Sequence, residues 1–207
     1  ANFMIVDSES NANGFCEHGG QAGLLDCLLR FHDNLPILSL VCTAWNSSIK
    51  SSLFRPDMIL KEHIEMLVRD LGVHTESETF CQVALKMMAN VSFGSEERIT
   101  LIANASGVGQ IESIMQRYRQ NSSILELTMA VLVNLSHGGE YMRMSINERC
   151  ADEIIQILFD HDGDVGLALH AVRAIGTLAY CEACVSRLVT EGATRGVVNA
   201  SRKHPDH

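Results

Sequence analysis

The chain has 207 residues, 46% of them hydrophobic and 20% charged, so it carries enough apolar side chains to bury a sizeable core. Its formal net charge is −9 and Lys and Arg form no dense cluster, which argues against nucleic acid as the main partner. No apolar run approaches the roughly 20 residues that a membrane-spanning helix needs, so we expect no insertion into a membrane.

The seven cysteines are odd in number and scattered from position 16 to position 184, mostly among Leu, Val and Ala. A disulfide framework has an even number of closely spaced cysteines. We therefore interpret them as small buried residues of a protein in a reducing compartment, the cytoplasm or alternatively the nucleus.

A short motif closes an apolar run at a constant spacing along the chain. Its marker positions are Asn46, Asn90, Asn134 and Thr177, which are 44, 44 and 43 residues apart. Another step of 44 residues toward the N-terminus leads to Asn2 in a similar local sequence. Such a fixed period indicates a repeat architecture.

Each marker follows a run of apolar residues at helical spacing. The residues two, five and nine positions before the four markers share one helical face: Ala44, Val41, Ile37; Met88, Leu85, Cys81; Leu132, Met129, Leu125; and Ile175, Val172, Ala168. Asn34 with Pro36 predicts the start of the first of these helices. Ser122 or Ser123 is expected to cap the third, and Asp162 or Asp164 the fourth.

A second helix is expected before each of these. Its apolar stripe contains Leu24, Cys27, Leu28; then Ile64, Leu67, Val68; then Ile111, Ile114, Met115; then Ile154, Ile157, Leu158. Stretches such as 97–103 and 141–146 suit a short first helix, and glycines separate the helices. No segment alternates with period two, so we predict three helices per repeat and an all-α chain.

A three-helix repeat of 43–44 residues that ends in Asn-Val/Leu-Ser resembles the armadillo repeat. The resemblance covers essentially the whole chain. It implies a tail of one repeat at 1–10, repeats at 11–50, 51–94, 95–138 and 139–182, and the start of a further repeat at 183–207. It also implies a right-handed superhelical solenoid whose third helices line a concave groove.

Members of that family are scaffolds and adaptors without a common enzymatic activity, and their marker Asn binds the backbone of an extended peptide. The resemblance therefore implies a non-enzymatic adaptor for a protein or peptide partner, either an extended segment or a helix. The implied groove residues are Asn46, Gln82, Lys86, Asn90, Glu126, Asn134, His170, Arg173 and Thr177, with Ser39, Cys42 and Ala130 beside them.

Two alternatives apply to these groove residues. The asparagines suit hydrogen bonds within the local fold equally well, since Asn near a helix end often bonds to the backbone. Lys86 and Arg173 either bind acidic side chains of a partner or are simply solvated charges. A spacer or self-association module without a groove ligand is the alternative function.

Signals of chemistry are weak. Cys181 and Cys184 form a single Cys-x-x-Cys pair without the second pair of ligands that a zinc site needs. The segment 160–164 lacks the Gly and Glu spacing of a calcium loop. We therefore expect no catalytic residue, no cofactor and no metal.

The two ends of the sequence fall inside repeats. The chain opens where a third helix ends, and Val197 and Val198 lie in a second helix without a following third one. We expect a fragment of a longer array that is able to associate end to end or as a homo-oligomer.

Overall fold

The computed structural model describes residues 8–205, and within that range every regular element is a helix. The chain forms two compact units, the first extending to Phe93 and the second beginning at Gly94. The marker Asn2 lies outside the described residues.

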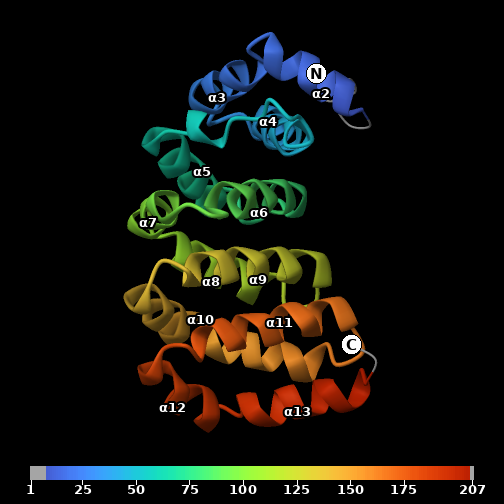
Figure 1. Cartoon of the computed structure of the whole chain (residues 1–207), viewed down its shortest axis with the longest axis vertical. Coiled ribbons are helices and arrows are strands. Elements are labelled where there is room, and N and C mark those ends of the chain that lie inside the picture. Colours follow the sequence, from blue (N-terminus) through green and yellow to red (C-terminus); the bar gives the residue numbers. More distant parts are fainter. Residues whose placement is uncertain (1–7, 206–207) are drawn as a thin grey trace. The chain divides into compact units, whose positions relative to one another are not determined.

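The described part of the first unit, from residue 8 to Phe93, contains five α-helices and one 3-10 turn, coloured blue to green in Figure 1. They are α2 (Glu9–Glu17), α3 (Gly20–Arg30), α4 (Leu35–Ser48), η1 (Pro56–Met58), α5 (Lys61–Val73) and α6 (Glu78–Ser92). The second unit is coloured green to red. It contains α7 (Glu96–Asn104), α8 (Gly107–Arg117), α9 (Ser122–Ser136), α10 (Glu140–Asp160), α11 (Val165–Leu178), α12 (Glu182–Thr190) and α13 (Ala193–Lys203).

The third helices of the repeats are α4, α6, α9 and α11, and in each unit the two of them pack directly against each other. Of the twelve apolar residues predicted on their inner faces, ten are buried, whereas Ile37 and Val172 are half-buried. Trp45 and Phe80, which lie beside these stripes, are almost fully buried. The predicted all-helical repeat is confirmed.

Every third helix begins with a polar cap at the repeat period. The side chains of Asn34, Ser77, Asn121 and Asp164 each accept a hydrogen bond from the backbone N–H three residues later. Asn34 and Asp164 agree with prediction. The predicted Ser122 or Ser123 cap is wrong, because Asn121 takes that place and Ser122 is already the first helical residue.

The first helices differ from the expected short, separate helix in two repeats. In the repeat at 51–94 only η1 forms, because Pro56 disfavours helical backbone at Arg55, which is extended. In the repeat at 139–182 the expected helix at 141–146 continues into the second helix as α10. In the neighbouring repeat the first and second helices are separated at Ser106, which has a φ of 67° and is followed by Gly107. The corresponding part of α10 contains no glycine.

The serine of the Asn-x-Ser motif has a structural role in three repeats. Ser48, Ser92 and Ser136 are buried, and each hydroxyl donates to the carbonyl three residues earlier, at 2.7, 3.1 and 2.6 Å. These bonds satisfy carbonyls in the last turn of the third helices. Part of the marker motif therefore serves the end of the helix rather than a ligand.

Candidate functional site

Each third helix presents one partly exposed stripe of side chains, and we call these stripes the third-helix surfaces. In the first unit they comprise Ser39, Leu40, Thr43, Asn46 and Ser47 of α4, and Gln82, Val83, Lys86, Ala89 and Asn90 of α6. In the second unit they comprise Glu126, Leu127, Ala130, Val133 and Asn134 of α9, and Leu169, His170, Arg173, Gly176 and Thr177 of α11.

Charge is sparse on the third helices. They contain only two acidic residues, Glu78 and Glu126, and two basic ones, Lys86 and Arg173. Their formal charges cancel, so the net charge of −9 comes from the remainder of the chain. A surface with few charges loses less hydration when a partner covers it.

In the first unit the marker asparagines are hydrogen-bonded to each other across the repeat. Asn46 Nδ2 donates to the carbonyl of Val83 at 2.9 Å, and Asn90 Nδ2 donates to Asn46 Oδ1 at 3.1 Å. Both polar atoms of Asn46 are therefore used to join α4 to α6. The Oδ1 atom of Asn90 accepts no hydrogen bond from the described residues.

The other predicted residues of the first unit lie on α6. Gln82 is half-buried and donates to Glu78 at 3.4 Å, whereas Lys86 is exposed. Cys42, expected beside them, is instead fully buried, and burial raises the pKa of its thiol to about 12. Its place in the core follows from the turn of α4, on which Thr43 rather than Cys42 faces outward.

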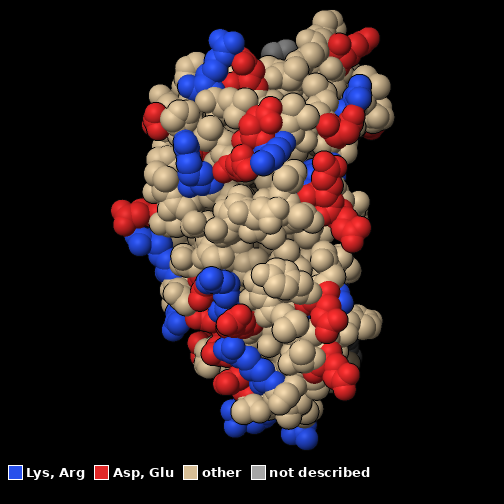
Figure 2. All heavy atoms as spheres, turned by 90° about the vertical axis from the view of Figure 1, so that its left-hand side faces the viewer, with Lys and Arg blue, Asp and Glu red and all other residues tan. Residues whose placement is uncertain are grey.

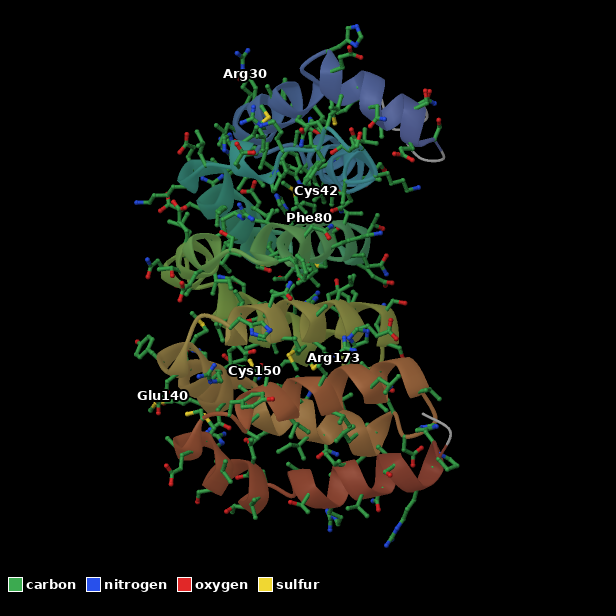
Figure 3. All side chains as sticks on the ribbon, in the orientation of Figure 1. Arg30, Cys42, Phe80, Glu140, Cys150 and Arg173 are labelled. Carbon is green, nitrogen blue, oxygen red and sulfur yellow. The ribbon has the colours of Figure 1, made fainter. Side chains whose placement is uncertain are left out.

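In the second unit the fourth marker bonds within its own helix. Thr177 Oγ1 donates to the carbonyl of Ala174 at 2.8 Å. Asn134 is half-buried on α9, and Arg173 is exposed on α11 (Figure 3). Glu126 lies against the start of α11, where a Cβ atom at Gly166 would come within 2.5 Å of Glu126 Oε1.

The structure thus places the nine predicted residues in two groups. Asn46, Gln82, Lys86 and Asn90 lie together in the first unit. Glu126, Asn134, His170, Arg173 and Thr177 lie on the packed pair α9 and α11 in the second.

The Cys-x-x-Cys pair lies at a helix start. Cys181 is the N-cap of α12 and Cys184 lies in its first turn, with both side chains buried. Burial, with the adjacent Cys181 thiol, raises the pKa of Cys184 to about 12, so the unreactive thiol form predominates at neutral pH. Within residues 8–205 no group of three or more His, Cys, Asp or Glu side chains could hold a metal.

Sequence reasoning missed a set of exposed rings near the C-terminal ends of the third helices. Phe93 and Tyr180 stand three residues after their markers and are 73% and 84% exposed. Tyr141, at the start of α10, is 83% exposed. The residues three positions after the four markers are Ile49, Phe93, His137 and Tyr180. Comparing this position across the repeats would have found two of the three rings.

Among the described residues, no helix is both long and apolar enough to cross a membrane. The sequence matches no family model and no curated protein. Solved structures do match. A designed armadillo repeat protein is 15% identical with a TM-score of 0.71, and the match covers 98% of this chain and 88% of that one. An engineered protein is also 15% identical, with a TM-score of 0.74 over 98% and 83% of the chains. The chain therefore has an armadillo-like helical repeat fold.

Proposed function

We propose that this chain is a non-enzymatic protein-interaction scaffold that binds an extended partner segment on its third-helix surfaces. The observation that carries the proposal is the character of these surfaces. They are partly exposed, sparsely charged and rich in amide, hydroxyl and small apolar side chains, whereas the rest of the chain carries the net charge. Such a surface suits a peptide backbone, whose polar groups are neutral and regularly spaced.

Asn90 is the residue best placed to hold that backbone. Its Nδ2 atom is fixed by Asn46, which orients the amide, and its Oδ1 atom is left to accept from a backbone N–H of the partner. Asn134 occupies the equivalent position on α9. We assign Asn46 to the packing of α4 on α6 instead, because both of its polar atoms are used there.

Lys86 and Arg173 give the surfaces a preference for acidic side chains. Both are exposed, and neither forms an ion pair with the described residues. Glu126 opposes this preference on the second unit, so the expected charge effect is modest. Lys86→Glu and Arg173→Glu should weaken an acidic ligand more than a neutral one, and less at high salt.

The test begins with capture of a partner by the full chain, followed by titration of that partner. Asn90→Ala with Asn134→Ala removes two amides worth about 0.5–1.5 kcal/mol each, so affinity should fall roughly 5- to 150-fold. Ser113→Ala, on the exposed side of the second helix α8, is the matched control and should bind normally. Unchanged affinity in a folded double variant would place the binding surface elsewhere.

A further inference from the structure

A second exposed surface lies in the second unit, outside the third-helix surfaces. We call it the edge patch and define it by Tyr141 and Met144 of α10 with Tyr180 and Ala183 near the start of α12. The two tyrosines are 83% and 84% exposed, and Met144 is 46% exposed. Tyrosine rings offer large contact areas at low cost in side-chain entropy, and such exposed rings are frequent in protein interfaces.

Two contacts place these segments side by side. The Cys181 thiol lies 3.8 Å from Glu140 Oε1, to which it donates, and Arg187 Nη1 donates to the carbonyl of Glu148 at 3.1 Å. The first half of α10 therefore runs along α12. Tyr141 and Met144 are three residues apart on one helix face. Tyr180 lies in the turn directly before α12, and Ala183 lies in the first turn of that helix.

Three exposed carboxylates lie on the same two helices as the edge patch. Glu140, Glu148 and Glu182 are exposed, and none of them forms an ion pair with another described residue. Two cations lie nearby. Arg187 is occupied by Asp152, to which its Nη2 donates at 3.1 Å to each oxygen. Arg143 is half-buried, and its Nη1 donates to the carbonyl of Ser136 at 3.0 Å, so this single positive charge faces the three carboxylates. Figure 3 labels Glu140 at the start of α10, and Figure 2 views the chain from that side, where uncharged surface lies among the charged groups.

We propose that the edge patch is a docking surface for a basic segment of a partner protein, bound through Lys or Arg side chains. The faces of the tyrosine rings attract cations, and the three carboxylates supply the opposite charge. Charge complementarity favours this occupant over an acidic segment, which the carboxylates repel. A purely apolar segment would leave the carboxylates partly desolvated without a counter-ion.

The test uses two labelled 12-residue peptides, one alternating Lys with Ser and the other Glu with Ser, and measures binding to the full chain by fluorescence anisotropy. We expect the Lys peptide to bind and the Glu peptide not to bind. Tyr141→Ala with Tyr180→Ala should weaken the Lys peptide about 5- to 30-fold, the product of two exposed cation–π contacts. The Phe double variant keeps both rings and should bind within about twofold of the original chain.

Charge specificity has its own matched control. Glu140→Gln with Glu182→Gln should weaken the Lys peptide, whereas Glu9→Gln with Glu17→Gln, which removes the same charge from α2, should not. Equal weakening by both pairs would show nonspecific attraction and overturn the proposal, as would failure of the Lys peptide to bind. Concentration-dependent dimerisation that is lost in the Tyr→Ala variant would identify a second copy as the occupant and also overturn it. None of these three results depends on binding at the third-helix surfaces.

Discussion

The third-helix pair of the first unit and that of the second solve the same packing problem with different polar contacts. Between α4 and α6, Asn46 donates to the Val83 carbonyl and accepts from Asn90, so one side chain joins two repeats. On α11, Thr177 instead donates to Ala174 of its own helix. A shared repeat position therefore fixes the location of a side chain but not its role.

This difference changes the meaning of the marker motif. In the first unit the asparagines contribute to stability, because Nδ2 and Oδ1 of Asn46 each form a hydrogen bond between α4 and α6. In the second unit the hydroxyl of Thr177 bonds within its own helix. We therefore expect substitutions at the marker positions of the two units to lower the free energy of unfolding by different amounts.

The largest expected effect is that of Asn46→Ala. It removes two hydrogen bonds between α4 and α6 and leaves the Asn90 amide without its partner, so the free energy of unfolding should fall by about 2 kcal/mol. Thr177→Ala should cost less, about 0.5–1 kcal/mol, since the hydroxyl bonds only within α11. Urea denaturation of both variants checks the order.

Hydrogen exchange shows which helices lose stability in the Asn46→Ala variant. Amides of α6 should exchange faster in Asn46→Ala, while those of α9 and α11 keep their protection. Equal losses of stability in the two variants would show that the bonds between α4 and α6 contribute no more than a local hydroxyl bond.

An intermediate effect is expected at the junction of first and second helices. At Ser106 the backbone is left-handed, which costs a non-glycine residue about 1–2 kcal/mol, whereas the greater freedom of glycine in the unfolded chain costs about 0.4–1 kcal/mol. Ser106→Gly should therefore stabilise by up to about 1 kcal/mol. Glu148→Gly, inside the continuous helix α10, should destabilise by about 1 kcal/mol, whereas Glu148→Ala should be nearly neutral. Thermal unfolding of the three variants tests the opposite signs, and a stabilising Glu148→Gly would contradict a continuous α10.

Much of the fold follows from the sequence because the repeat period constrains every element. The apolar stripes, the markers and the Asn34 cap were predictable from spacing and residue chemistry. The same period also relates Asn34 to Ser77, Asn121 and Asp164, and applying it to the caps would have replaced Ser122 with Asn121.

The fused helix and the surface roles were harder to predict. A stretch without glycine is compatible with both a turn and a continuous helix, and tertiary packing decides between them. The bond from Asn46 to Val83 joins residues 37 positions apart, and no local pattern specifies it. The exposure of Tyr141 and Tyr180 likewise depends on tertiary packing, because it is set by whether another helix covers their side chains.

The smallest expected effect is a pH dependence of opposite sign in the two units. Burial raises the pKa of Asp70 in the first unit, although Arg69, His32 and His74 oppose the shift. The folded state then holds the proton more tightly, so the stability from this group falls as pH rises from about 3.8 through the raised pKa. Asp70→Asn should remove that decline in urea titrations at a series of pH values.

Asp164 in the second unit behaves oppositely. The Leu167 N–H lowers its pKa, with help from Ser122, so its contribution is present above pH 3.8 and is lost as pH falls through the lowered value. Asp164→Asn keeps an effective N-cap and should remove this acid sensitivity. If both Asn variants changed the pH dependence of stability in the same direction, at least one of the two pKa assignments would be wrong.

The central claim is that the third-helix surfaces hold the partner, and hydrogen exchange of the full chain with and without the captured partner tests it most directly. We expect added protection on α6, α9 and α11, centred on the turns that contain Asn90, Asn134 and Arg173. Protection should be weaker in the Asn90→Ala, Asn134→Ala variant at the same partner concentration. Protection confined to the second helices α3, α5, α8 and α13, with the third helices unchanged, would contradict the account.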